Sequence, residues 1–246
     1  MSLRYTKPNS RQSLHGFTLV ELMVVIVIIV VLAALAFLGM NRVRDMADKA
    51  ASIRNLSQLQ VANASYAADH NGNFVAIRAN DSGGKTTRWF EDPDYLRNLM
   101  GEVLGSSGRQ STSVPIGLLD PKVVRARQPL YDRLYTSYGM NDTGLKLGGE
   151  PNLNSYNSVN RIRNPTRSMA FATATDFRVN YNSRFKWDFD DPKDIKTSAG
   201  SIAYRHNKKI LVVYYDGHVG EMSKADLQEI DRSRRGKNSA FWLPTQ

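Results

Sequence analysis

The carboxylate of Glu21 has the most unusual setting of any side chain in this sequence. It stands at the start of an apolar run from Leu22 to Met40, and those 19 residues carry no charge. About 20 apolar residues suffice for a helix to cross a bilayer, so this run can span a membrane once. An acid in a membrane segment costs roughly 2.5–3.5 kcal/mol on insertion scales, and such residues are functional candidates by default. We therefore expect Glu21 to meet a partner of opposite charge.

A histidine and an Asp-Gly pair form a second group of candidate residues. Nine residues separate His206 from Asp216, which is followed by Gly217. If they flank one strand, about 3.3 Å per residue places His206 and Asp216 roughly 20 Å apart. A shared metal ion or an acid–base pair is then not expected, and polar strand ends with turn chemistry are the preferred interpretation. His218 could reach Asp216 locally, but two groups are not a catalytic constellation.

Four aspartates around Trp187, Phe189 and Pro192 could in principle hold a hard cation; they are Asp188, Asp190, Asp191 and Asp194. Ca²⁺ takes several oxygen ligands, which such a run can supply. The spacing lacks the EF-hand pattern, so a solvated acidic loop is preferred and calcium is the alternative. No other cofactor or metal is expected. The sequence contains no Gly-x-Ser-x-Gly, Walker loop or His-Glu-x-x-His motif, so we expect no enzyme.

Residues 16–22, Gly-Phe-Thr-Leu-Val-Glu-Leu, resemble the processing site of type IV prepilins and type II secretion pseudopilins. A short basic leader precedes them, whereas an ordinary signal peptide has its cleavage site after the apolar stretch. The resemblance implies that a membrane-embedded prepilin peptidase cuts after Gly16 and methylates the new amino terminus at Phe17. A plain signal anchor with a stray acid is the alternative.

The same resemblance implies a role for Glu21 in assembly, and physical chemistry supports it. If cleavage frees an amine at Phe17, a neighbouring subunit can offer that positive charge to Glu21 inside a filament of stacked apolar helices. A broken buried ion pair costs about 3–5 kcal/mol, so Glu21 would favour only assemblies that neutralise it. The implied partners are further copies of this chain in a helical filament, the peptidase/methyltransferase, an inner-membrane assembly platform and membrane lipid.

The elements that position these residues predict an α+β, pilin-like fold, in which a long N-terminal helix packs on a small antiparallel sheet with irregular loops. No proline interrupts residues 17–70, and Asn71-Gly72 is typical of a helix end. Apolar residues recur at helical spacing after the span: Val43, Met46, Ala50, Ile53, Leu56 and Leu59. We divide the chain into a cleaved leader (1–16), the transmembrane half of the helix (17–40), its amphipathic half (41–71), a loop-rich globular region (72–200) and a C-terminal meander with a short helix (201–246).

Within the globular region we expect a loop with little core over 73–92, a short helix after Pro93 reaching Leu104, and a strand over 168–174. The C-terminal pattern predicts three strands, at 201–205, 210–215 and 218–222. Asp216-Gly217 is expected to form a type I′ hairpin turn, and Asn207-Lys208-Lys209 the other turn. Ser223 and Asp226 resemble a capping box, so a helix should follow. The sheet should lie on the apolar face of 43–68.

Three short pieces resemble a bacterial prepilin-like group that carries a C-terminal His-x9-Asp-Gly signature: residues 65–74, residues 137–141 (Ser-Tyr-Gly-Met-Asn), and the signature itself at His206, Asp216 and Gly217. Proteins of that group commonly have a Cys-Pro step before the second piece. This chain has Asp120-Pro121 there and contains no cysteine, so neither a disulfide nor a cysteine-bound metal is available.

The formal charge is +10, and loss of the leader, with Arg4, Lys7 and Arg11, leaves about +7. Much of that excess lies near the C-terminus, at Arg232, Arg234, Arg235 and Lys237. Such a surface could contact nucleic acid or anionic envelope polymers. A solvated face is the preferred interpretation, and nucleic acid is not expected as a partner.

Basic residues on both sides of the span leave its orientation open. The resemblance implies a single-pass protein of the bacterial inner membrane with its globular part in the periplasm, which could be extracted into a filament or surface pilus. The expected function is that of a pseudopilin-like structural subunit of a type II secretion-type filament. The alternative is a type IV pilus subunit that acts in adhesion or in capture of DNA or substrate.

Overall fold

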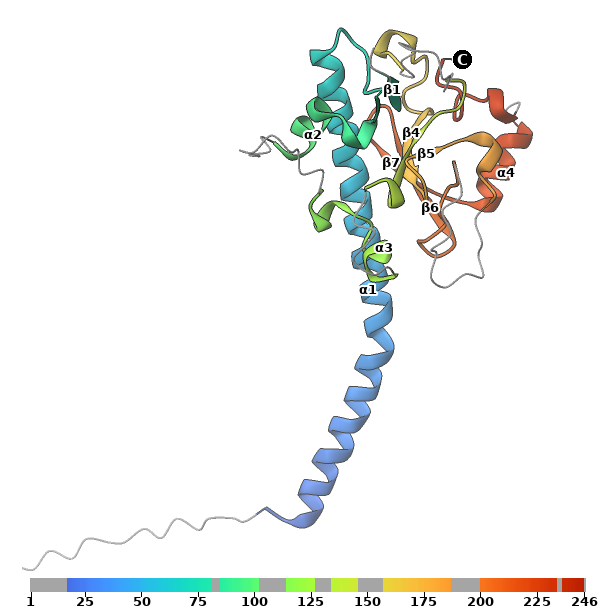
Figure 1. The fold of residues 1–246 in the computed structure, drawn as a ribbon. Coiled ribbons are helices and arrows are strands. Elements are labelled where there is room, and N and C mark those ends of the chain that lie inside the picture. Colours follow the sequence, from blue (N-terminus) through green and yellow to red (C-terminus); the bar gives the residue numbers. More distant parts are fainter. Residues whose placement is uncertain are drawn as a thin grey trace, which may run out of the picture. The chain divides into compact units, whose positions relative to one another are not determined.

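The computed structural model describes residues 17–80, 85–101, 114–126, 134–145, 157–186, 200–233 and 236–245. The chain divides into two compact units, Met1–Arg44 and Asp45–Gln246, called unit 1 and unit 2 below. Helix α1 (Leu19–Asp69) contributes to both units, and all the described strands belong to unit 2 (Figure 1).

Unit 1 contains the apolar part of α1. Of the helices in the described residues, α1 is the one that is long and apolar enough to cross a membrane. None of its apolar window is buried against the described residues, and Phe37 is 74% exposed. Because an apolar surface this continuous requires a cover, lipid or other apolar helices must supply it. The exposed apolar helix is therefore consistent with a membrane-anchored protein.

The C-terminal end of α1 lies in unit 2 and is fixed by left-handed backbone. Asn71 has φ 54° and Gly72 has φ 79°. The Gly72 N–H donates to the carbonyl of Ala67 at 2.8 Å, which satisfies one of the carbonyls left free at a helix end. The predicted end of the helix at Asn71-Gly72 is confirmed.

The main sheet of unit 2 has five strands in the order β5-β3-β4-β6-β7. They are β3 (Tyr138–Asn141), β4 (Met169–Thr173), β5 (Arg178–Val179), β6 (Lys209–Tyr214) and β7 (Val219–Ser223). All neighbouring pairs are antiparallel except β3 and β5, which run parallel. The sequence predicted β4, β6 and β7, but not β3 or β5.

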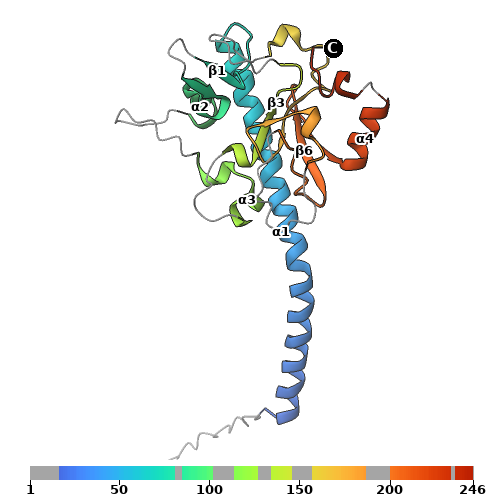
Figure 2. The ribbon, with the colours of Figure 1, turned by 45° about the vertical axis from the view of Figure 1, so that its right-hand side comes forward.

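The two faces of β6 belong to two hydrophobic clusters, as expected for a strand buried on both sides. Leu211 and Val213 pack in the cluster that contains Leu56 and Leu59 of α1. Ile210, Val212 and Tyr214 pack in the cluster that contains Leu227 of α4 (Lys224–Ser233) and the C-terminal aromatics Phe241 and Trp242. Helix α1 thus covers one face of the sheet, while α4 and the C-terminal segment cover the other (Figure 2). The α+β class is confirmed.

The buried face of α1 is shorter than the sequence pattern predicted. Val43 is 66% exposed and Met46 is 71% exposed, although both fit the helical spacing of the apolar stripe. Contact with the core begins near Ile53 and is complete at Leu56. Helical periodicity alone could not show where the sheet begins to cover α1, because that depends on the partner surface.

The expectation of a loop with little core over 73–92 is wrong. Strands β1 (Arg78–Asn80) and β2 (Thr86–Arg88) pair antiparallel, and Trp89 is fully buried in the cluster with α1. Its indole N–H donates to the carbonyl of Phe177 at 2.6 Å. Five apolar residues of 73–92 are buried, and they follow neither a helical nor a strand period, because this segment consists mainly of turns and one short helical turn. They are Phe74, Val75, Ile77, Trp89 and Phe90.

Two further helices are short. Helix α2 (Pro93–Met100) is capped by Asp92 and ends at Gly101, whose φ is 78°. The helical spacing of apolar residues predicted that this helix reaches Leu104, but residues 102–113 lie outside the described part of the chain. Helix α3 (Pro121–Ala126) follows Asp120. The short length of α3 leaves it dependent on side-chain contacts with α1, which are described below.

The first predicted C-terminal strand, 201–205, is reduced to one bridge between Ile202 and Ala174. Most of β4 is already paired with β6, from Met169 with Tyr214 to Ala172 with Val212, so little of its edge is left for a further strand. The segment 201–205 and β6 compete for the same backbone N–H and C=O groups of β4, and strand propensity does not indicate which of them pairs. The expected strand is therefore wrong, and so is its place in a meander beside 210–215, because β6 pairs with β4 and β7.

The type I′ turn lies at a different place from the one predicted. Asn207 and Lys208 both have positive φ, 53° and 59°, and the backbone groups of His206 and Lys209 exchange hydrogen bonds of 3.2 and 3.0 Å. This is the geometry of a two-residue I′ hairpin. At the other end of β6 only Gly217 has positive φ, 93°, so the turn at Asp216-Gly217 is not of type I′.

Candidate functional site

The start of α1 is a capping box built from Thr18 and Glu21. The Thr18 N–H and the Thr18 hydroxyl each donate to Oε2 of Glu21 at 2.8 Å. The Glu21 N–H donates to Oγ1 of Thr18 at 3.2 Å. Together these bonds satisfy orphan donors at the helix start. This pairing was not predicted, although the pattern Thr-x-x-Glu before an apolar run is the signature of a capping box.

This geometry leaves the predicted assembly residue accessible. Glu21 is exposed, and both side-chain hydrogen bonds reach the same oxygen, Oε2. Among the described residues, Oε1 has no hydrogen-bond partner and remains available to a cation. Phe17, the predicted new amino terminus, is 86% exposed. Gly16 and the rest of the leader lie outside the described residues.

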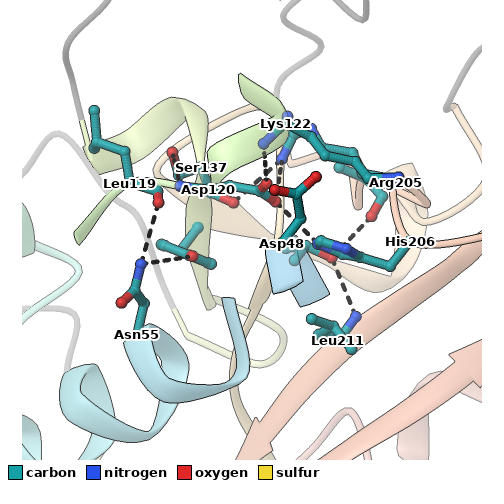
Figure 3. Close-up of polar contacts among 12 residues, drawn as sticks. Asp48, Asn55, Leu119, Asp120, Lys122, Ser137, Arg205, His206 and Leu211 are labelled. Atoms are coloured by element: carbon teal, nitrogen blue, oxygen red, sulfur yellow. Dashed lines mark hydrogen bonds and ion pairs between the residues drawn. The ribbon is translucent and has the colours of Figure 1, made fainter. Parts of the chain in front are cut away.

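His206 and Asp120 form the centre of a buried polar network in unit 2 (Figure 3). The Nε2 atom of His206 is 3.2 Å from Oδ2 of Asp120, and Nη1 of Arg205 is 3.8 Å from the same oxygen. The side chains of Asp120, His206 and Arg205 are 0%, 1% and 3% exposed. A solute therefore cannot reach these groups, so the network holds the fold together and offers no acid or base to a substrate.

Backbone contacts anchor both sides of this network. Asp120 caps α3, because its Oδ1 accepts the N–H of Lys122 at 2.9 Å, and its own N–H donates to Oγ of Ser137 at 3.0 Å. The guanidinium of Arg205 donates to the carbonyls of Thr136 and Ser137 at 3.0 and 3.3 Å. Residues 136–137 lead directly into β3, so the network joins α3, the start of β3 and the segment before β6.

The charges in this network favour an ionised Asp120. Burial acts to raise the pKa of Asp120, but the hydrogen bond with His206 and the positive charge of Arg205 outweigh burial. The pKa of Asp120 therefore lies below its ordinary value. In contrast, Nδ1 of His206 is buried without a hydrogen-bond partner among the described residues.

The expectation that His206 is only a polar strand end is wrong. The turn at Asn207 and Lys208 lies next to His206, whose ring is buried against Asp120, a residue 86 positions earlier in the chain. No local pattern reports such a contact. As predicted, His206 and Asp216 lie at opposite ends of β6, so the structure does not bring the signature residues together.

Asp216 and His218 form a local turn at the other end of β6. Oδ1 of Asp216 accepts the N–H of His218 at 3.2 Å and lies 2.6 Å from its Nδ1. The His218 ring stacks on Tyr214 with 4.1 Å between ring centroids. Gly217 supplies the left-handed residue of this turn. Turn chemistry is therefore confirmed for Asp216 and Gly217.

Ion pairs join α3 and the β6–β7 strands to residues 45–49 of α1. Arg125 of α3 pairs with Asp48, and Lys122 pairs with Asp45 at 2.8 Å. Lys49 and Lys209 both pair with Glu221 of β7. The bonds from Lys209 and Lys49 hold the pKa of Glu221 below its ordinary value. These contacts fix α3 and β7 beside α1.

The acidic run at 188–194 lies outside the described residues, so the solvated loop stays a prediction and calcium binding stays its alternative. The described residues contain no cluster of three or more His, Asp or Glu side chains arranged to hold a metal. Arg234 and Arg235, two of the four C-terminal basic residues, also lie outside the described part.

Comparison with known proteins identifies the N-terminal segment. Residues 12–37 match the family model described as the prokaryotic N-terminal methylation motif. No curated protein and no solved structure matches the chain. The matched segment contains Gly16, Phe17, the capping box of Thr18 and Glu21, and much of the apolar part of α1. The match supports a type IV pilin-like or pseudopilin subunit that is processed by a prepilin peptidase.

Proposed function

We propose that this protein is a pseudopilin-like structural subunit of a type II secretion-type filament. The observation that carries the proposal is the methylation motif at 12–37, joined to an apolar helix whose surface no described residue covers. A catalytic protein would need an accessible site, whereas the best-developed polar network in the described residues is closed to solvent. The covering of α1 by the same helix of other subunits accounts for the exposed surface.

The proposed route begins with cleavage between Gly16 and Phe17, which frees a positively charged amine. Glu21 stands one helical turn into α1, with Oε2 held by Thr18 and Oε1 open. A neighbour's amine can then bind Oε1 without breaking the capping box. Because an unpaired charge in a filament core is strongly unfavourable, assembly proceeds only in the register that joins the two.

The location follows from the same proposal. The leader stays on the cytoplasmic side, the apolar part of α1 crosses the inner membrane, and unit 2 lies in the periplasm. The partners are the prepilin peptidase/methyltransferase, an assembly platform in the inner membrane, membrane lipid and further copies of the chain.

Mass spectrometry of protein extracted from membranes tests the processing step. We expect a polypeptide that begins at Phe17 and carries one methyl group on its amine. Gly16→Ala should leave the chain uncleaved, because the peptidase of this family reads the residue before the cut. A wild-type chain that still begins at Met1 would refute the proposal.

Filament assembly in cells tests the role of Glu21. Glu21→Ala should be cleaved normally but fail to assemble, and Glu21→Asp should assemble partially because its carboxylate is one methylene shorter. Thr18→Val is the matched control, since it removes the hydroxyl of the capping box and keeps the charge. If Thr18→Val and Glu21→Ala lose assembly equally, then Glu21 acts as a helix cap and not through its charge.

Imaging and secretion assays separate the proposed role from the alternative of a type IV pilus subunit. A deletion strain that loses secretion of an exported protein, and regains it with the wild-type gene, supports the secretion role. Long surface filaments that contain the protein, in a deletion strain with normal secretion, would favour the pilus subunit.

A further inference from the structure

Strand β7 stands at one end of the main sheet, and its outer edge is open. Among the described strands it pairs with β6 alone, in an unbroken register from Lys209 with Ser223 to Val213 with Val219. All five residues of β7 are half-buried. The strand at the opposite end, β5, has only two residues. A very short edge strand offers little to a further strand, whereas a regular edge of this length is a template for one.

The hydrogen-bond pattern shows which backbone groups of β7 point away from the sheet. The Tyr214 N–H donates to the carbonyl of His218 at 3.0 Å, and residue pairs of an antiparallel ladder alternate between bonded and non-bonded. Residues 218, 220 and 222 therefore direct their backbone groups toward β6. Val219 and Glu221 direct their N–H and C=O groups outward, and these groups have no hydrogen-bond partner in the described part of the chain.

Strand β7 lacks the features that commonly block a sheet edge. It contains no proline, and its register with β6 has no bulge. Its charged side chain, Glu221, lies opposite Leu211 on the face toward α1, where it pairs with Lys49 and Lys209. This charge therefore does not project across the edge. Outward N–H and C=O groups at every second residue fit another extended backbone.

A groove beside β7 lies on the other face of the sheet, the face toward α4. Met222 of β7, Tyr214 of β6 and Phe241 contribute its apolar lining. The Tyr214 ring lies across β7, because an added Cβ on Gly220 would be 3.1 Å from the ring, and the Tyr214 hydroxyl is 3.9 Å from Sδ of Met222. The lining of the groove thus reaches the edge strand itself.

The charged residues of the groove select the side chains that suit it. Asp226 and Glu229 of α4 both line the groove and are exposed, and the cation among the lining residues is Arg167. Ser223 bonds only to Oδ2 of Asp226, so Oδ1 is without a hydrogen-bond partner among the described residues. The excess of carboxylates favours a basic side chain, whose apolar stem can pack on the Tyr214 ring.

The geometry of an added strand joins the edge to the groove. Successive side chains of a strand point to opposite faces, so every second residue of a strand beside β7 faces α4 and the groove. We propose that the outer edge of β7 binds an extended polypeptide segment as a further strand, and that the groove takes lysine or arginine side chains from alternate positions of that segment. This binding does not rest on the proposed filament role, because β7 and α4 contain no residue of the N-terminal assembly site.

The probe for the test is a fluorescent seven-residue peptide of alternating valine and lysine, blocked at both ends. Fluorescence anisotropy should show saturable binding to the full-length chain in a non-ionic detergent. A peptide with glutamate in place of lysine should bind about tenfold more weakly, because attractive contacts at the groove become repulsive. The formal charge of +10 favours the acidic peptide in general, so tighter or equal binding of that peptide would overturn the proposal.

N-methylation of the peptide tests the backbone contacts with the wild-type protein. The valine amides lie along one edge of an extended peptide and the lysine amides along the other. Two isomers, methylated at either the valine or the lysine amides, therefore each block one edge. One isomer should keep the parental affinity, and the other should lose at least about tenfold because two backbone hydrogen bonds cannot form. Equal affinities of the two isomers would overturn the proposal.

A matched pair of variants tests the edge from the side of the protein. Glu221→Ala and Glu221→Pro both remove the ion pairs with Lys49 and Lys209, but only proline removes the outward N–H. Proline is tolerated in an edge strand where the N–H faces solvent, and melting temperatures check that both variants fold. Glu221→Pro should bind the valine–lysine peptide at least about tenfold more weakly than Glu221→Ala. Equal binding would overturn the proposal.

A second pair of variants tests the groove. Glu229→Gln should weaken binding of the valine–lysine peptide about two- to fivefold, as expected for loss of one exposed charge pair. Asp69→Asn is the control, because it removes an exposed acid that is not among the groove residues and should leave the affinity unchanged. Equal loss in both variants would overturn the proposal, since net charge would then explain binding. Cleavage after Gly16 should be normal in every variant, so failure here is distinct from failure of the proposed function.

Discussion

Replacement of Asp120 by asparagine should destabilise unit 2 far more than any change in the exposed part of the His206–Asp216 signature. Asparagine keeps the volume of the side chain and an oxygen that can accept the N–H of Lys122. It removes the negative charge that lies 3.2 Å from His206 Nε2 and 3.8 Å from Arg205 Nη1. The amide nitrogen of asparagine is a donor, and in the place of Oδ2 it would face the N–H groups of Arg205.

The expected magnitude follows from burial. Loss of one partner from a buried ion pair costs about 3–5 kcal/mol, because the remaining charge stays desolvated. The side chains of Asp120, Arg205 and His206 are almost completely buried, so solvent cannot compensate for the lost carboxylate charge. For a unit of this size, 1 kcal/mol lowers the melting temperature by about 2–4 °C, which gives a decrease of roughly 6–20 °C.

Thermal unfolding of the full-length chain in detergent, followed by tryptophan fluorescence, measures this effect. Trp89 and Trp242 are fully buried and report loss of the two clusters. Asp216→Asn is the matched control: its pair with His218 is partly exposed, so its loss should cost at most about 1 kcal/mol.

A double-mutant cycle completes the test. His206→Ala alone should cost more than about 2 kcal/mol, since it removes a charge-assisted hydrogen bond and leaves a small cavity. In the Asp120→Asn background the same change should cost less, because the two residues act on each other. If Asp120→Asn lowers the melting temperature no more than Asp216→Asn does, the network contributes nothing to stability and the reasoning fails.

Two further predictions concern stability. Gly217→Val should lower stability by about 1–2 kcal/mol, because φ is +93° while nothing lies within 4 Å of an added Cβ, so backbone strain and not a clash is the cause. Gly217→Asn should cost less, since asparagine tolerates this conformation, and equal costs in urea unfolding would contradict the argument. Burial raises the pKa of Asp142 from 3.8 to about 6, despite its pair with Arg178. A raised carboxyl pKa means that this group stabilises the fold below about pH 4 and that its contribution is lost as the pH rises through 6, on the order of 2–3 kcal/mol. Melting temperatures of wild type and Asp142→Asn should therefore diverge between pH 4 and 7 in favour of the variant, and parallel pH profiles would show that Asp142 titrates normally.

Features with a local cause could be predicted from the amino-acid sequence. The apolar part of α1 and the acid Glu21 at its start are visible in the composition of the segment. The helix end follows from the positive φ of Asn71 and Gly72. The capping box of Ser223 and Asp226 before α4 is also local, with bonds of 2.7 to 3.2 Å between residues three apart. Patterns of this kind are visible in a few consecutive residues, so they could be predicted.

Contacts between residues far apart in the sequence became visible only in the folded structure. His206 became part of a buried network because Asp120, far away in the sequence, capped α3 beside it. Trp89 entered the core although its neighbours show no period, and β3 formed because β4 and β5 offered edges on both sides. These outcomes depend on long-range geometry and on competition for partners, and neither quantity is written in a local stretch of sequence.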